Sequence, residues 1–313
     1  MGSITSNMIV AGALVLPFLP GCAGRAGDGA FPARETAVPA PEPGEEPFLR
    51  GIRQLTFEGQ NAEAYWGPGD DRLVFQATPD SLACDQIFTM RADGSEKRRV
   101  STGRGVTTCG FFHYPGGDRI LYASTHAEME GCPPRPDYSR GYVWPIHAEY
   151  DIWTARPDGG DLRRLTDSPG YDAEATFSRD GSRIVFTSVR DGDLEIYSMD
   201  ADGSDVRRLT HEEGYDGGAF FSYDGSKIVY RAHHPEEGEP LDDYRGLLAA
   251  GLVRPSRMEI WVMDADGTGK RQVTDNGAAN FAPYFFPDGD RIVFSSNLHD
   301  PSGRNFDLYV VGL

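Results

Sequence analysis

A short segment built around a tight turn recurs along this chain. Residues 175–186 read ATFSRDGSRIVF, residues 219–230 read AFFSYDGSKIVY and residues 283–294 read PYFFPDGDRIVF. Weaker copies occupy residues 64–75 and 111–122. Each copy has two β-rich runs around a glycine-containing turn. This pattern is typical of a β-hairpin because glycine accepts a positive φ.

A third and a fourth predicted strand follow each hairpin, so that the unit has strands A to D in chain order. The third strands alternate in polarity at residues 86–90, 151–155, 195–199, 259–263 and 307–311. Turns such as Asp200-Ala201-Asp202-Gly203 then lead into short fourth strands such as residues 207–210. A four-stranded antiparallel unit of roughly 40–45 residues is the blade of a β-propeller.

The strand count predicts an all-β fold, a β-propeller of five blades. The last blade has no fourth strand after its third one, and the chain ends at Leu313. Residues 52–56 read IRQLT and match the fourth strands of the other units. We therefore expect residues 52–56 to pair with residues 307–311 and close the last blade.

The repeats resemble those of the TolB-like β-propeller family. The resemblance rests on residues 165–210 (LTDSPGYDAEATFSRDGSRIVFTSVRDGDLEIYSMDADGSDVRRLT) and 217–235 (GGAFFSYDGSKIVYRAHHP) and covers residues 52–313. It implies a periplasmic propeller that binds other molecules, sometimes envelope lipoproteins. Rings of this family usually have six blades, so the alternative architecture is a six-bladed ring with one blade missing.

The first 51 residues predict export and anchoring. Residues 8–20 are apolar, too few to span a bilayer but typical of an export signal. Residues 19–22 read LPGC, which resembles a bacterial lipoprotein box and implies lipidation of Cys22. An ordinary secretory signal is the alternative. We assign residues 1–22 to a lipoprotein-type signal segment, residues 23–51 to a flexible Pro/Gly-rich tether and residues 52–313 to the propeller. The predicted location is the bacterial cell envelope, periplasmic or anchored to the outer membrane.

The net charge limits the classes of binding partner, and the cysteine content indicates the redox environment. The formal net charge of −18 opposes binding to nucleic acids and to anionic membrane surfaces. Membrane contact is therefore expected only through a lipid at Cys22. Cys84, Cys109 and Cys132 predict one disulfide and one free thiol in an oxidising compartment, with three possible pairings.

Long insertions separate strands B and C in two blades, at residues 124–150 and 233–258. They place extra chain on the face that carries the B–C and D–A connections, where binding usually resides. The aromatic residues Tyr138, Tyr142 and Trp144 predict either a contact patch or an anchor for the first insertion. Residues 242–253 have the only clear helical pattern.

Polar residues recur on this face where strand A begins. One set of equivalent positions is Asn61, Thr108, Asp172, Asp216 and Asn280, and a second, two residues on, is Glu63, Gly110, Glu174, Gly218 and Ala282. We predict a ligand-binding rim formed by Asn61, Glu63, Asp172, Glu174, Asp216, Asn280, His233 and His234. Such a rim suits a divalent cation, a polyol or a basic peptide. The alternative is that Asp and Asn here satisfy loop backbone groups.

Catalytic signatures are scarce. The sequence contains no G-x-S-x-G, no P-loop and no dinucleotide fingerprint, and His211-Glu212-Glu213 lacks the second histidine of HExxH. No catalytic residue and no cofactor is assigned. The sequence favours a binding module that captures an envelope protein or a small polar ligand. The alternative is an enzyme, a metal-assisted hydrolase or lyase, working at the channel mouth.

Overall fold

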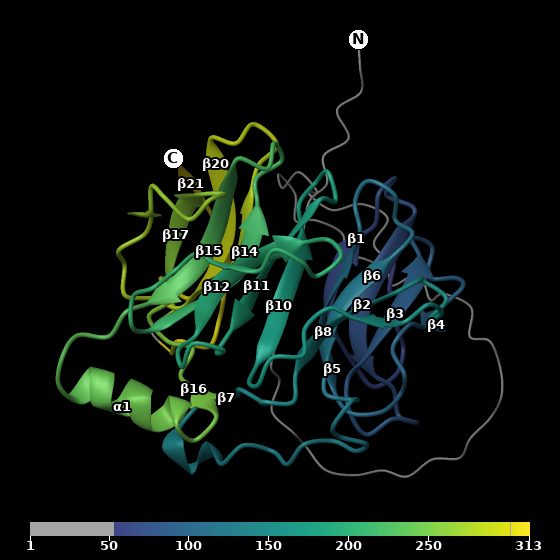
Figure 1. The fold of residues 1–313 in the computed structure, drawn as a ribbon, viewed down its shortest axis with the longest axis horizontal. Helices are drawn as coiled ribbons and strands as arrows, with labels where there is room; N and C mark the ends of the chain where they lie inside the picture. The colour runs from purple at the N-terminus through teal and green to yellow at the C-terminus, as the bar shows by residue number, and fades with distance from the viewer. Residues whose placement is uncertain (1–52, 301) are drawn as a thin grey trace, which may run out of the picture.

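The computed structural model describes residues 53–300 and 302–313, which form five antiparallel blade sheets in succession around a shared core (Figure 1). The predicted all-β, five-bladed propeller is confirmed. Within this part of the chain, no helix combines the length and apolar character that crossing a bilayer would require. Residues 1–52, including Cys22 and the predicted signal and tether, lie outside the described residues.

The first two blades each contain four strands in sequence order. The first blade is β1 (Gln60–Trp66), β2 (Arg72–Thr78), β3 (Gln86–Arg91) and β4 (Arg98–Arg99). The second blade is β5 (Thr107–Phe112), β6 (Ile120–Ser124), β8 (Asp151–Ala155) and β9 (Arg163–Arg164).

The remaining blades repeat this order, and the last one has three strands in the described part of the chain. The third blade is β10 (Asp172–Phe177), β11 (Arg183–Ser188), β12 (Glu195–Asp200) and β13 (Arg207–Arg208). The fourth blade is β14 (Tyr215–Phe221), β15 (Lys227–His233), β17 (Glu259–Asp264) and β18 (Arg271–Gln272). The fifth blade is β19 (Asn280–Phe285), β20 (Arg291–Ser296) and β21 (Asp307–Gly312). The outer, fourth strands of the first four blades are only two residues long: β4, β9, β13 and β18.

Neighbouring blades bury opposite faces of their sheets against each other. Val185 and Ile196 of the third blade share a buried cluster with Tyr230 of the fourth. The register of β20 with β21 makes Leu308 the counterpart of Ile196 in the fifth blade. Ile196 is fully buried, whereas Leu308 is 60% exposed. Among the described residues, the outward face of the last blade is therefore exposed at Leu308, where the equivalent position of the third blade is packed.

The N-terminal segment lies beside the first blade. Leu55 lies against Gly94 in the turn after β3, as Leu165 lies against Gly203 in the turn of the third blade. Leu55 thus packs against the first blade in the way that Leu165, which follows the fourth strand of the second blade, packs against the third blade.

The predicted closure by residues 52–56 remains a prediction. Ile52 lies outside the described residues, and β21 pairs with β20 in the part of the chain that the structure describes.

The two insertions meet on one face of the molecule (Figure 1). The first carries a 3-10 helix, η1 (Tyr138–Arg140), and β7 (Trp144–Pro145). The second carries α1 (Glu239–Leu248) and β16 (Leu252–Val253), and β16 pairs with β7. The helix begins and ends earlier than the predicted 242–253. Pro240 lies at its start and the apolar residues that follow its end belong to β16.

One disulfide ties the first insertion to the first blade. Cys84, in the loop before β3, is bonded to Cys132, and Cys109 is free. This selects one of the three pairings that the sequence left open.

Candidate functional site

Strand A of every blade contains the same β-bulge. The register with strand B shifts at this point in all five pairs. One residue of each bulge has a positive φ: Glu63 (48°), Cys109 (56°), Glu174 (54°), Gly218 (59°) and Ala282 (50°). Because a bulge adds an unpaired residue and bends its strand, it changes the direction of the side chain there. The five bulges bring these residues to one pocket.

The sequence alignment of the second blade was wrong by one residue. The structure makes Thr107 and Cys109 the counterparts of Asp172 and Glu174, in place of Thr108 and Gly110. The reason is the A–B turn. Residues 113–119 separate the last paired positions of β5 and β6, one residue more than residues 178–183 in the third blade.

Aromatic side chains fill the axis below the bulges. Tyr65 lies 5.4 Å from Phe111 and 6.3 Å from Phe220, measured between ring centroids. Phe111 lies 6.1 Å from Phe220, which in turn lies 5.3 Å from Tyr284. These rings come from four different blades, so they form a solid floor in place of an open channel.

The paired insertions form a roof above the bulges. Trp144 of β7 lies opposite Val253 of β16 in the two-residue ladder. Its ring lies 5.4 Å from that of Phe281 and covers the guanidinium of Arg231 at 5.3 Å. The first insertion therefore reaches across from the second blade to side chains of the fourth and fifth blades.

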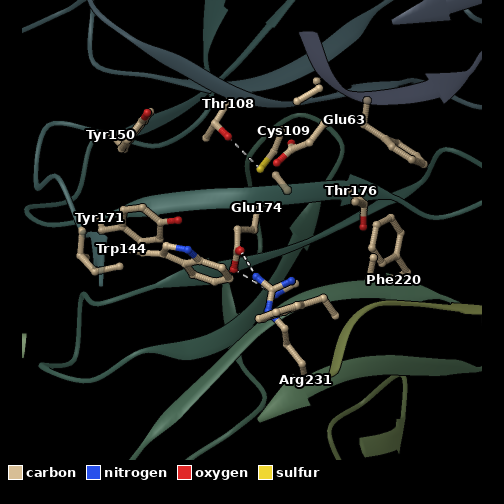
Figure 2. Close-up of a pocket in the computed structure, with 18 of the residues that line it drawn as sticks. Glu63, Thr108, Cys109, Trp144, Tyr150, Tyr171, Glu174, Thr176, Phe220 and Arg231 are labelled. Atoms are coloured by element: carbon tan, nitrogen blue, oxygen red, sulfur yellow. Dashed lines mark hydrogen bonds and ion pairs between the residues drawn. The ribbon is translucent and has the colours of Figure 1, made fainter. Parts of the chain in front are cut away.

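A pocket of about 460 Å³ lies between roof and floor. Its walls are largely aromatic and include Tyr150, Tyr171 and Phe281. Glu63, Glu174 and Arg231 are the charged side chains among its lining residues. Figure 2 shows Trp144 beside the Glu174–Arg231 pair and Glu63 beside Cys109.

Glu174 and Arg231 form a buried ion pair in the wall of the pocket. Tyr215 Oη donates to Glu174 Oε2 at 3.0 Å, and Arg231 Nη2 donates to the same hydroxyl at 2.8 Å. Thr187 Oγ1 and the backbone amide of Gly218 also donate to Glu174 Oε2, at 2.9 and 3.0 Å. Burial opposes the charge of Arg231, but Glu174 and Tyr215 outweigh it and raise the pKa of the guanidinium. Both carboxylate oxygens of Glu174 are thus engaged by protein groups.

Glu63 has a different environment. Its Oε2 atom is buried and has no hydrogen-bond partner among the described residues. Burial raises the pKa of the Glu63 carboxyl, a hydrogen bond from Cys109 lowers it, and the charge of Glu174 raises it further, so that the net shift is upward. A buried carboxyl without a cationic partner is costly when ionised. It is the one charged group of the pocket lining that the described residues leave unsatisfied.

Cys109 is a weak nucleophile in this setting. Burial, followed by the charges of Glu63 and Glu174, raises the pKa of the Cys109 thiol. The thiol therefore stays protonated, and the thiolate is the reactive form of cysteine.

Of the eight predicted rim residues, Glu63 and Glu174 line the pocket. Asp172 instead binds Arg190, with Oδ2 at 3.0 Å from Nη2, and accepts from Ser168 Oγ at 2.9 Å. Its carboxyl is therefore engaged within the third blade, outside the pocket lining.

Asp216 and His234 form a second engaged pair. His234 Nε2 lies 3.1 Å from Asp216 Oδ1, and His234 Nδ1 lies 3.3 Å from Glu212 Oε2. His233 is half-buried, and burial lowers its pKa. None of these side chains lines the pocket.

The two predicted asparagines also lie outside the pocket lining. Asn280 is buried and donates to the backbone oxygen of Met258 at 2.7 Å, whereas Asn61 is exposed and donates to that of Glu58 at 3.0 Å. Both satisfy loop carbonyls, as the structural alternative predicts. In the described residues, no three His, Cys, Asp or Glu side chains are grouped to hold a metal ion.

Sequence reasoning missed Arg231. The strand B copies carry Gln76, Ala123, Thr187 and Ser295 at its position. The available signal was a single arginine at a position where the other four blades carry neutral residues. Trp144 was noted only as a loop aromatic, because its contacts depend on a pairing between insertions that are distant in sequence.

The comparisons with known proteins agree with this architecture. Residues 134–244 match the family described as the Tricorn protease N-terminal beta propeller domain. A 39-residue segment, 12% of this chain, is 51% identical to the Tol-Pal system protein TolB of Bordetella pertussis and spans 9% of that protein. This local similarity to a TolB protein agrees with the resemblance described for residues 165–210.

Solved structures share the propeller fold of this chain. TolB from Acinetobacter baumannii superposes with a TM-score of 0.56 at 18% identity, over 82% of this chain and 55% of that chain. The putative TolB from Agrobacterium tumefaciens gives 0.57 at 18% identity, over 85% and 80%. Hydrazine synthase from Kuenenia stuttgartiensis gives 0.58 at 15% identity, over 83% and 38%. The chain spans about half the length of the Acinetobacter protein. At these identities the likeness concerns the fold alone.

Proposed function

We propose that this propeller is a binding module of the bacterial envelope that captures its ligand in the central pocket, from the face carrying the B–C and D–A connections. The ligand is a small polar molecule or a protein segment that enters beneath the roof formed by β7 and β16.

One observation carries the proposal. The pocket of about 460 Å³ falls within the roughly 300–1,000 Å³ typical of ligand sites, and it joins aromatic walls to a few charged groups. The first long insertion lines the pocket through residues such as Trp144, and the second supports it by pairing β16 with β7, although neither insertion is needed to complete a blade.

The cysteine pairing and the sequence relatives support the location and the partner. The Cys84–Cys132 disulfide agrees with an oxidising compartment. The name of the Bordetella relative, a Tol-Pal system protein, favours an envelope protein as partner. Cys22 is proposed to carry the lipid that holds the chain at the membrane.

Capture from envelope extract by the soluble propeller tests the proposal. Thr108→Trp would fill the pocket and Trp144→Ala would open its roof, and each is expected to weaken capture about tenfold or more. Tyr138→Ala is the matched control, because Tyr138 lies on the same insertion, is 56% exposed and does not line the pocket. Capture that is unchanged by Thr108→Trp, in a variant that melts like the wild type, would refute the proposal.

A further inference from the structure

We propose that the Glu63 carboxylate recognises an alkylammonium group whose apolar remainder packs against the aromatic walls of the pocket. This inference rests on the ligand-binding function proposed above and specifies the charge of the ligand.

Charge balance is the first argument. Glu174 and Arg231 neutralise each other and are already hydrogen-bonded to protein groups. Glu63 is then the one charged lining group without a counter-ion in the described part of the chain. An ammonium group brings one positive charge and three donors, which is what a lone carboxylate lacks.

The walls of the pocket supply the second argument. Tyr150, Tyr171 and Phe281 line it, and the first two are in edge contact at 5.8 Å. Aromatic faces attract cations and pack well against apolar groups. A carboxylate or phosphate ligand would instead meet the Glu63 carboxylate, and the Arg231 guanidinium that could attract it is already paired with Glu174.

Linkage to pH follows from the groups around Glu63. Tyr65 and Cys109 remain neutral because burial raises their pKa values, and Glu174 and Arg231 stay paired. Glu63 has a raised pKa in the empty pocket, and a bound cation would lower it again. Binding of an ammonium ligand therefore releases a proton, and its affinity rises with pH until Glu63 is ionised in the free protein.

Three probes of one shape test the charge preference: 2-phenylethylammonium, 2-phenylethanol and phenylacetate. Ligand-observed NMR titration at pH 8 is expected to show the ammonium binding about tenfold tighter than the alcohol, and phenylacetate weakest. Glu63→Gln keeps the side-chain shape and should bring the ammonium and the alcohol to equal affinity. Glu236→Gln removes the same charge from an exposed position outside the pocket lining and should preserve the preference.

Two outcomes would overturn the inference: equal binding of ammonium and alcohol by the wild type, or an unchanged preference in Glu63→Gln. His147 also lines the pocket, so the rise in affinity with pH should persist in His147→Gln. Thermal melting of each variant confirms that it is folded.

A second titration with peptides distinguishes two possible sources of the ammonium group, a lysine side chain of a protein and a small amine. End-blocked Ala-Lys-Ala is compared with its norleucine counterpart. Preference for the lysine peptide indicates a basic protein segment as ligand, whereas preference for 2-phenylethylammonium alone indicates a small amine. If neither cation binds, the ammonium site is refuted. The proposed capture function then still depends on the Thr108→Trp result, so the two failures are distinguishable.

Discussion

Single residues in unusual backbone conformations position the chemistry of this site. Glu63, Cys109 and Glu174 all have a positive φ, which is uncommon for residues with a side chain. Residues held in such conformations tend to cluster at functional sites. The fourth and fifth blades keep the same bulge with Gly218 and Ala282, which add no functional group. The bulges thus supply polar groups to the pocket from the first three blades, whereas the fourth blade supplies Arg231 from strand β15.

Removing Arg231 should be strongly destabilising. Arg231→Met would leave Glu174 as an uncompensated buried charge, and breaking such a pair costs about 3–5 kcal/mol. Urea unfolding at pH 7 measures this loss. The double variant Glu174→Gln with Arg231→Met should recover much of it, since no charge is then left unpaired. A double variant as unstable as Arg231→Met alone would show that packing, in place of charge, dominates.

Glu63→Gln should change the pH dependence of stability. Because the folded-state pKa of Glu63 is raised, its ionisation opposes folding. The wild type therefore loses stability as pH rises from the unfolded-state pKa through the folded-state pKa. The neutral variant does not have this loss. Melting temperatures should be similar below pH 4 and higher in Glu63→Gln at pH 8. Parallel curves for the two proteins would contradict the assignment.

At the scale of elements, the two insertions depend on each other. The β7–β16 ladder holds two residue pairs, and Arg254 adds a bond from Nη1 to the backbone oxygen of Arg140 at 2.9 Å. Inside the second insertion, α1 buries Leu241, Tyr244 and Leu247. A two-residue ladder is weak by itself, so the anchoring contacts at both ends determine how firmly the roof is held.

The disulfide is one of these anchors. Replacing Cys84 and Cys132 with serine is expected to lower the free energy of unfolding by about 2–4 kcal/mol, as is usual for native disulfides. Denaturant unfolding measures the change, and reduction of the wild type should reproduce it. If the serine variant and the reduced wild type both match the oxidised wild type, the bond does not stabilise the folded state.

The sequence allowed the blades to be predicted better than the site. The Asp-Gly turns and alternating strands fixed five units because each hairpin is a local signal. Glu63 and Glu174 were found because the same polar position recurs along the chain. The roles of Trp144 and Arg231 could not be inferred, since they arise from contacts between insertions and blades far apart in sequence. Asp172 and Asp216 were included because a strand pattern does not reveal which charged neighbour will engage them.

At the scale of the whole molecule, we expect equivalent positions in the third and fifth blades to differ in their tolerance of a charged side chain. Leu308→Lys should change stability by no more than about 0.5 kcal/mol, because Leu308 is 60% exposed. Ile196→Lys, at the same place in the third blade, would bury an unpaired charge and should prevent folding or destabilise by several kcal/mol. Thermal melts of the two variants provide the comparison. Equal and large losses would mean that the face of the last blade is packed in solution.

The short outer strands have a consequence for self-association. A foreign chain adds to a sheet by continuing its ladder, and β4, β9 and β13 each offer two exposed or half-exposed arginines in place of a long hydrogen-bonding edge. β21 is six residues long and carries exposed Leu308 and Val310. Protection of the fifth blade against aggregation therefore depends on a segment that covers the edge of β21. Residues 52–56 are the strand predicted to do so.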